Sequence, residues 1–240
     1  MLVILRHGES TLNAEDRFSG WADCPLTPVG LRQAHDAGRA LRKAGVSFGS
    51  CFTSVLSRAR DTAAIVLGEM GLADIPVAAS WQLNERHYGI LEGVPKSCAV
   101  AKYGAAQVEA WRNAADAAPP PLAADDARQP RLKTMYSGIA TELLPSSECL
   151  RAAFKRVTGY FDCAIRPLIE SGESVLVVSH GNPVRAMIAH LQGLPDGEIP
   201  AMEISNTAPV VYQAGNSGRL VRVPWTVNTA NHGMDGMSKW

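Results

Sequence analysis

Two stretches of the sequence carry the strongest signal for the fold: Leu2-Val3-Ile4-Leu5-Arg6-His7-Gly8-Glu9 and Ser174-Val175-Leu176-Val177-Val178-Ser179-His180-Gly181. Each stretch is a short apolar run that ends in a His-Gly pair. Runs that are apolar at every position are typical of strands buried on both faces, as in parallel sheets. Because the carboxyl ends of parallel strands lie at one edge of the sheet, we expect His7 and His180 to meet there.

The chain around these two stretches alternates between helix and strand signals. Thr27-Pro28 predicts the start of a helix, and Ser147 is the expected cap of the strongest helix pattern. Other expected elements are a strand over Cys51–Val55, a helix over Arg58–Met70, a helix beginning at Pro183 and a strand over Val210–Tyr212. The first helix is expected to bury Leu31, Ala34, Gly38 and Leu41. The strongest helix is expected to bury Leu150, Phe154, Val157, Phe161, Ile165 and Leu168. This alternation predicts an α/β fold, a three-layer α/β/α sandwich around a mostly parallel sheet.

Length and composition limit the domain organisation and the cellular setting. At about 150 residues per domain, 240 residues allow one large domain or two small ones. Because the strand and helix signals look alike along the chain, we expect a single domain over 1–240. The Ala-, Asp- and Pro-rich patch Ala114–Pro130 predicts a lid-like segment inserted at about residues 90–145 that covers the substrate. The five cysteines have no paired spacing, which favours a reducing compartment and a cytoplasmic location.

Charge and hydropathy exclude several classes of partner. Lys+Arg and Asp+Glu both number 23, so the chain is not a strongly basic nucleic-acid binder. No apolar run approaches the roughly 18 residues that a membrane span needs. We therefore expect no nucleic-acid partner and no membrane partner.

Basic residues accompany the two His-Gly pairs. Arg6 precedes His7, and Arg58 lies just beyond the strand expected over Cys51–Val55. Two arginines and two histidines at one sheet edge would form an oxyanion pocket, because the planar guanidinium matches phosphate bidentately. The alternative is that the histidines are unrelated loop residues; their repetition at two strand ends favours convergence.

The same residues point to phosphoryl transfer. A neutral imidazole is a nucleophile toward phosphorus, and Arg6, Arg58 and His180 would stabilise the charge that develops. Glu85, in Leu83-Asn84-Glu85-Arg86-His87-Tyr88-Gly89, is the candidate proton shuttle; alternatively it is a surface carboxylate paired with Arg86. No carboxylate cluster has metal-ligand spacing, so we expect no metal.

At this point the motifs identify a resemblance. Arg6-His7-Gly8-Glu9 with Ser57-Arg58 and Ser179-His180-Gly181 resembles the histidine phosphatase superfamily. Longer matches resemble the cofactor-dependent phosphoglycerate mutases. They are Arg6–Ser10 leading to Asn13, Arg17–Trp21, Leu26-Thr27 with Gly30, Thr53–Leu56 with Arg58-Ala59, Leu83–Gly89, Lys102–Gly104 and Trp111-Arg112. The resemblance runs from residue 3 to about Tyr212.

The resemblance implies a role for each matching residue. His7 would be the nucleophile, cycling through a phosphohistidine, and Glu85 the proton donor and acceptor. The transferring phosphoryl group would be held by Arg6, Asn13, Arg58, His180, Gly181 and Asn182. The residues expected at the rest of the substrate are Ser19, Gly20, Arg86, His87, Tyr88, Lys96, Arg112 and Asn113, with His87 orienting its loop.

The resemblance also implies a reaction. Such a mutase is primed by 2,3-bisphosphoglycerate and interconverts 3- and 2-phosphoglycerate, in glycolysis and gluconeogenesis. The partner would be this acid or a closely similar phosphorylated hydroxy acid, and the family's homodimers or homotetramers are expected.

Three departures from the family pattern keep other functions open. Asn113 stands where the family has a second arginine, the segment after Pro130 is abbreviated, and Ile204-Ser205-Asn206-Thr207 replaces the usual Ile-Pro-Thr-Gly. All three fall where substrate is enclosed. A phosphatase acting on a small phosphorylated metabolite is therefore the alternative, and a non-catalytic module that binds a phosphorylated ligand is a remote one.

Overall fold

The computed structural model describes residues 1–195, 202–215 and 219–225, and these residues form a six-stranded sheet in the order β3-β2-β4-β1-β5-β6. Four strands run parallel: β1 (Leu2–Arg6), β2 (Ser50–Thr53), β3 (Val77–Ala79) and β4 (Val175–Ser179). The strands β5 (Val210–Ala214) and β6 (Leu220–Val223) are antiparallel to their neighbours. Arg6 at the end of β1 pairs with Ser179 at the end of β4, so both His-Gly pairs leave the sheet side by side.

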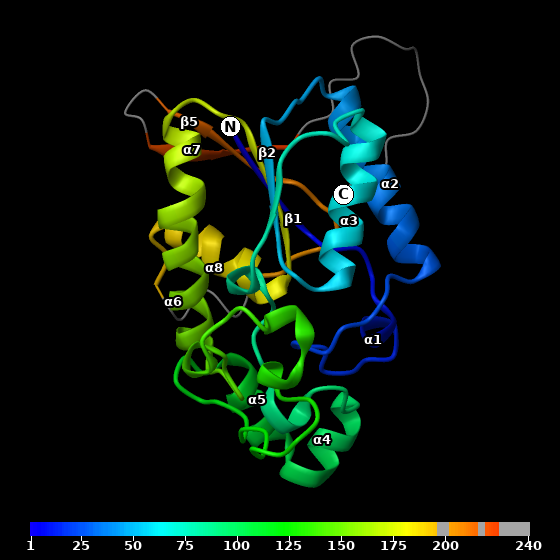
Figure 1. Ribbon diagram of the computed structural model, residues 1–240, viewed down its shortest axis with the longest axis vertical. Helices are drawn as coiled ribbons and strands as arrows, with labels where there is room; N and C mark the ends of the chain where they lie inside the picture. Colours follow the sequence, from blue (N-terminus) through cyan, green and yellow to red (C-terminus); the bar gives the residue numbers. More distant parts are fainter. Residues whose placement is uncertain (196–201, 216–218, 226–240) are drawn as a thin grey trace.

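Helices cover both faces of the sheet (Figure 1). On one face lie α2 (Pro28–Lys43) and α3 (Ser57–Met70), whose apolar residues pack against Val3 and Leu5. On the other lie α6 (Leu150–Tyr160), a π-helical turn (Phe161–Ile165), α7 (Arg166–Glu170) and α8 (Gly181–Gln192). Leu2 and Ile4 point into that second core. Successive residues of β1 thus point alternately into the cores on the two faces of the sheet. The predicted α/β/α sandwich is confirmed.

Three details of the helices differ from the prediction. Leu31 was expected to be buried but is 41% exposed. The buried face of α2 follows steps of three and four residues from Ala34, so Ala37 lies on it with Gly38 and Leu41. The cap of α6 is Cys149, whose sulfur accepts from the Ala152 amide; the Ser147 hydroxyl instead donates to the Pro119 carbonyl. The helix α8 begins at Gly181, two residues before Pro183.

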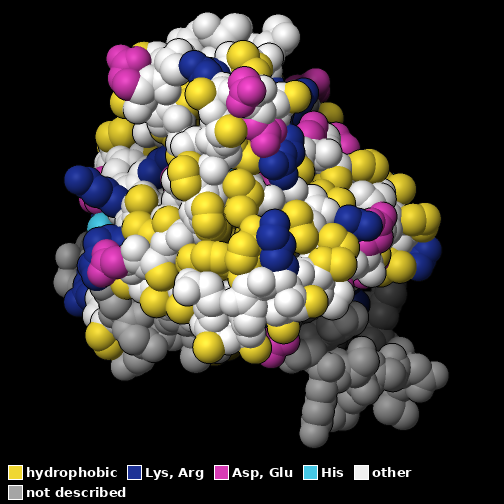
Figure 2. Space-filling model, turned by 90° about the horizontal axis from the view of Figure 1, so that it is seen from below, with side chains coloured by type: hydrophobic (Ala, Val, Ile, Leu, Met, Phe, Trp, Pro, Cys, Tyr) yellow, Lys and Arg dark blue, Asp and Glu magenta, His cyan; other side chains and the backbone are white. Residues whose placement is uncertain are grey.

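Residues 90–145 lie beyond the carboxyl edge of the sheet, in the lower part of Figure 1. The segment contains the helices α4 (Lys96–Tyr103) and α5 (Ala105–Asn113) and three 3-10 turns, Pro130–Leu132, Thr134–Tyr136 and Thr141–Leu143. The remaining short elements are the helix α1 (Thr11–Ala14) and the 3-10 turns Trp81–Leu83 and Gly89–Leu91. A small core of its own, built on Phe18, Leu91, Ala99 and Val108, holds this segment together. Figure 2 views the molecule from this side and shows hydrophobic side chains over much of the surface. The exposed hydrophobic residues of the segment include Leu132 and Leu143.

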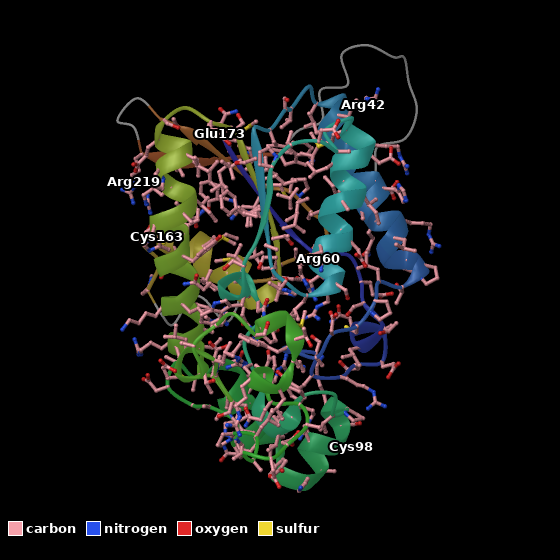
Figure 3. All side chains as sticks on the ribbon, viewed as in Figure 1. Arg42, Arg60, Cys98, Cys163, Glu173 and Arg219 are labelled. Atoms are coloured by element: carbon pink, nitrogen blue, oxygen red, sulfur yellow. The ribbon has the colours of Figure 1, made fainter. Side chains whose placement is uncertain are left out.

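All five cysteines are free. Figure 3 labels two exposed ones, Cys98 on α4 and Cys163 in the π-helical turn, at opposite sides of the molecule. None of the described helices is long and apolar enough to cross a membrane.

Candidate active site at the carboxyl edge of the sheet

His7 emerges from β1 into a buried position at the carboxyl edge. Its backbone amide donates to the Ser179 carbonyl at 2.9 Å, and its Nδ1 lies 2.6 Å from the Gly8 carbonyl oxygen. A carbonyl only accepts, so Nδ1 carries the hydrogen and the lone pair is on Nε2. Burial lowers the pKa of His7 well below its usual value, and the charges of Arg58 and Arg6 lower it further. The ring is therefore neutral near pH 7, the state in which an imidazole nitrogen can act as a nucleophile.

Arg58 begins α3 and lies fully buried beside His7. Its Nε donates to His7 Nε2 at 3.3 Å, while its two terminal nitrogens donate to the carbonyls of Gly20 and Ala22 at 2.8 and 2.9 Å. One turn further on, the Thr62 hydroxyl donates to the Arg58 carbonyl and accepts from the Gly8 amide. These contacts fix the guanidinium and the His7 loop relative to each other.

His180 and Arg6 complete the edge. His180 is the residue just before α8, and its ring lies edge-on to that of His7, with ring centroids 4.9 Å apart. Its Nε2 lies 2.7 Å from the Ser54 hydroxyl, and burial, with Arg58 next in size, lowers its pKa well below the usual value. Each of these two residues has one buried atom that meets no partner among the described residues, His180 Nδ1 and Arg6 Nε, although Arg6 Nη1 donates to the Ile204 carbonyl. Unpaired buried polar atoms are costly, and an anionic ligand between them would satisfy both.

Glu85 forms the facing wall of the site. Its carboxylate accepts from the Arg86 amide at 2.7 Å and from the side-chain nitrogen of Asn182 at 2.8 Å. That nitrogen also lies 3.2 Å from the Tyr88 hydroxyl. Asn182 and Gly181 are the first residues of α8, where the helix dipole favours an anion, and the Asn182 backbone amide donates to Glu85 Oε2 at 3.4 Å. The structure thus brings Glu85, Tyr88 and Asn182 together.

A buried ion pair that the sequence reasoning missed holds the Glu85 loop. Arg156, on α6, meets both carboxylate oxygens of Glu148 at 2.8 Å. The guanidinium also donates to the carbonyls of Gln82 and Glu85, and the Trp21 indole donates to the Glu85 carbonyl at 2.6 Å. The only sequence signal was an arginine beside an apolar helix face, which does not reveal a contact 71 residues away.

The loop 13–20 supplies three of the predicted residues. Asn13 accepts from the amide and hydroxyl of Ser10, which closes the N-terminal turn of α1. Ser19 is half-buried. Gly20 has a φ of +46°, and a Cβ there would lie 2.3 Å from a carboxylate oxygen of Glu92, so only glycine fits.

Two predicted substrate residues are buried in supporting roles. Arg86 donates to the carbonyls of Trp111 and Arg112, at the end of α5, and its guanidinium lies over the Tyr88 ring at 4.5 Å. His87 Nδ1 accepts from the Gly89 amide at 3.0 Å. Arg86 thereby joins the Glu85 loop to the inserted segment.

Three predicted residues are not brought into contact with the His7 group. Lys96 pairs with Asp16, and Arg112 lies 3.9 Å from Glu109. The Asn113 side chain donates to the same Glu109. These side chains lie on α4 and α5, each with an acidic partner close by in the fold.

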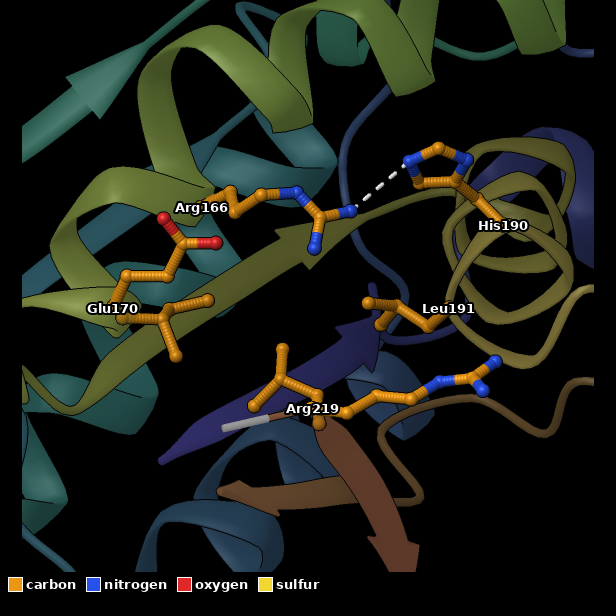
Figure 4. Close-up of a pocket in the computed structure, with 7 residues that line it drawn as sticks. Arg166, Glu170, His190, Leu191 and Arg219 are labelled. Atoms are coloured by element: carbon orange, nitrogen blue, oxygen red, sulfur yellow. Dashed lines mark hydrogen bonds between the residues drawn. The ribbon is translucent and has the colours of Figure 1, made fainter. Parts of the chain in front are cut away.

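A separate cavity of about 360 Å³ lies between α7, α8 and β6 (Figure 4). Its lining includes Arg166, His190 and Arg219, but Arg166 and His190 are paired with each other and with Asp162. None of the predicted site residues lines it. Among the described residues, no group of three or more His, Cys, Asp or Glu side chains is arranged to hold a metal ion.

The chain matches the histidine phosphatase superfamily (branch 1) over residues 2–143 and 122–225. It belongs to that superfamily. Within it, the chain is 46% identical over 211 residues to a 2,3-bisphosphoglycerate-dependent phosphoglycerate mutase of Nitratidesulfovibrio vulgaris (strain DSM 19637 / Miyazaki F). The match covers 88% of this chain and 85% of that relative.

Solved structures of histidine phosphatase fold include both mutases and phosphatases. A mycobacterial glucosyl-3-phosphoglycerate phosphatase, solved with VO3, superposes with a TM-score of 0.68 at 27% identity over 93% of this chain and 97% of that one. A phosphoglycerate mutase from Bacillus anthracis str. Sterne superposes with a TM-score of 0.64 at 22% identity, over 92% and 90% of the two chains. At these identities the superfamily fold is shared, while the reaction has to be argued from the site.

Proposed function

We propose that this protein interconverts 3- and 2-phosphoglycerate, or a closely similar phosphorylated hydroxy acid, by phosphoryl transfer through His7. The observation that carries the proposal is the state of His7. Its ring is neutral and buried, Nδ1 donates to the Gly8 carbonyl, and Nε2 accepts from Arg58 Nε at 3.3 Å. The 46% identity to a curated phosphoglycerate mutase supports the choice of substrate.

The first step needs a nucleophile and charge stabilisation. His7 Nε2 would form the bond to phosphorus while the bond from phosphorus to its departing oxygen breaks. Before the reaction, Arg58 Nε donates to the lone pair of His7 Nε2. Once that lone pair bonds to phosphorus, Arg58 Nε would donate to a phosphoryl oxygen instead. Arg6 Nε and His180 Nδ1 lack protein partners and would stabilise the other oxygens.

The second requirement is proton transfer at the substrate oxygen. Glu85 would take the proton of an attacking hydroxyl and return it to a departing one. Its carboxylate is held by Asn182 and by the Arg86 amide, and its loop is held by Arg156 and Trp21. Such support keeps the carboxylate in place during both half-reactions.

The site also fits the priming donor 2,3-bisphosphoglycerate. Two buried polar atoms without partners, on Arg6 and His180, suit one phosphoryl group, and Asn182 lies beside them at the start of α8. Bound there, the donor supplies the phosphoryl group that His7 carries. Lys96 and Arg112 would hold the other anionic end after exchanging their exposed acidic partners. Residues 90–145 would then cover the bound substrate. We propose that the chain forms a single domain and works in the cytoplasm.

A phosphatase is the second candidate, and a specific observation favours it. Asn113 is neutral and donates to Glu109, so that position offers no positive charge to retain a bisphosphorylated species. If the bisphosphorylated intermediate left the site, the phosphoryl group would not return to the substrate. If water entered the site while His7 carried the phosphoryl group, water would take that group and release free phosphate.

A coupled assay separates the two candidates. The protein is mixed with 3-phosphoglycerate and a catalytic amount of 2,3-bisphosphoglycerate, and 2-phosphoglycerate is detected with enolase. We expect 2-phosphoglycerate to form faster than free phosphate. Free phosphate without 2-phosphoglycerate would overturn the mutase proposal in favour of the phosphatase.

A further inference from the structure

Glu92 is a buried carboxylate that touches two loops of the site at once. It follows the turn Gly89–Leu91 and is 3% exposed. One oxygen, Oε1, accepts from the Trp21 amide at 2.7 Å and from the Tyr88 amide at 3.3 Å. The same oxygen lies 3.3 Å from Nδ1 of His87.

The two loops carry groups that the proposed mechanism needs. The Trp21 amide belongs to the loop of Ser19 and Gly20, and the Tyr88 hydroxyl reaches Asn182 beside Glu85. Gly20 is held from both sides, since Arg58 binds its carbonyl at 2.8 Å and Glu92 fills the space where a Cβ would stand. A shift of the Glu92 carboxylate would therefore move both loops.

We propose that Glu92 is a positioning residue which, in its ionised form, locks the Gly20–Trp21 loop to the Tyr88 loop and makes substrate affinity depend on pH. The proposal rests on the proposed function for the identity of the substrate. It concerns binding and not the transfer step, because Glu92 bonds backbone amides and its contacts do not include His7 or Glu85.

The surroundings of Glu92 make it titrate near neutrality. Burial raises its pKa to about 7, against the hydrogen bonds from Trp21 and Tyr88 and the charges of Lys133 and Arg58. Arg128 and the Tyr136 hydroxyl also face it.

His87, the nearest titratable neighbour of Glu92, stays neutral because burial lowers its pKa to about 3. Below about pH 7 the carboxyl of Glu92 is protonated, and its two amide bonds lose their charge-assisted strength. Substrate affinity should then fall.

Glu92→Gln tests this with an isosteric side chain that keeps a carbonyl acceptor but cannot ionise. At pH 8 we expect KM for 3-phosphoglycerate to rise about three- to tenfold, with kcat within about twofold. The KM of the wild type should rise more steeply between pH 8 and pH 6 than that of the variant. Both proteins share the titration of the substrate phosphate, so the difference between the two profiles isolates Glu92. Glu69→Gln, on α3 away from the site, is the matched control and should follow the wild type.

A second measurement does not depend on turnover. In backbone amide NMR spectra of the wild type, the Trp21 and Tyr88 resonances should shift with a common midpoint near pH 7, and this titration should vanish in Glu92→Gln. If the amides titrate but no 2-phosphoglycerate forms, the proposed function fails while the coupling stands. Identical amide titrations in both proteins, or a loss confined to kcat, would overturn the positioning role.

Discussion

Arg58 at the carboxyl edge of the sheet is held in the opposite way from two cations of the inserted segment 90–145, Lys96 and Arg112. Arg58, at the edge, is fully buried and donates to His7 and to two backbone carbonyls. Lys96 and Arg112, on the segment, have side chains 37% and 44% exposed. Their contacts are with acidic side chains instead of the backbone.

The difference separates chemistry from substrate choice. Charges at the edge are oriented before any ligand arrives, so no reorganisation is needed when charge develops on the phosphoryl group. Lys96 and Arg112 must first exchange an acidic partner, and exposed ion pairs are worth only roughly 0.2–1 kcal/mol. The edge can therefore stay the same while the segment adapts to different substrates, as expected in a superfamily that contains both mutases and phosphatases.

Removing the nucleophile should produce the largest effect. His7→Ala is expected to lower the turnover rate by at least about 10⁴-fold, because every cycle passes through this side chain. Acid-labile phosphoprotein, measured with labelled donor, should disappear as well. His35→Ala, an exposed histidine on α2, is the control and should retain label and activity. Label that persists in His7→Ala would place the nucleophile elsewhere.

Breaking the buried ion pair between Arg156 and Glu148 should produce the largest loss of stability. Glu148→Gln leaves the Arg156 charge buried without a counter-ion, and such a loss typically costs about 3–5 kcal/mol of unfolding free energy. Urea unfolding measures it. The matched control is Asp116→Asn, which removes an exposed carboxylate from Arg151 and should change little. Equal effects in the two variants would mean that Arg156 does not depend on Glu148.

The Glu92 carboxylate gives a pH-dependent effect of intermediate size. Its pKa is about 7 in the folded protein and near 4.5 when unfolded, so the folded state holds more protons between these values. Stability from this group is then present at low pH and lost as pH rises through 7, by up to ~3 kcal/mol. Glu92→Gln should gain stability over the wild type by about that amount between pH 4.5 and 8 in urea unfolding. A difference that is constant with pH would show that Glu92 ionises normally.

The edge of the sheet was predictable because its signals are local. The apolar runs before His7 and His180 predicted parallel strands, and parallel strands place their ends together. Arg58 was found in the same way, since it lies shortly after β2, at the second position of α3. The structure adds which atoms meet, such as Arg58 Nε and His7 Nε2.

The residues that hold the loops could not be predicted, because their partners are distant in sequence. Arg156 binds carbonyls 71 to 75 positions away, and Glu92 binds an amide 71 positions away. The helix pattern around Arg156 shows only that it lies beside the apolar face, and Glu92 stands in no periodic pattern. The exposed pairs of Lys96 and Arg112 were also hidden, since composition does not show that each positive charge has an acidic partner.

The smallest predicted effect comes from the inserted segment. Asn113→Arg adds a charge at the end of α5, beside Arg112 and within reach of Glu109. We expect the ratio of phosphatase to mutase rate to fall about two- to fivefold, which corresponds to the roughly 1 kcal/mol that an exposed charge pair contributes. Free phosphate and 2-phosphoglycerate, measured in one reaction, give the ratio.

Glu109 decides how this result is interpreted, because the new guanidinium could pair with it and never reach the ligand. The double variant Asn113→Arg with Glu109→Gln removes that partner and should lower the ratio further than Asn113→Arg alone. Glu109→Gln by itself is the control, since it frees Arg112 without adding charge. If neither the single nor the double variant moves the ratio, charge on the segment does not govern retention. The buried edge would then set the balance between transfer and hydrolysis as well as the chemistry.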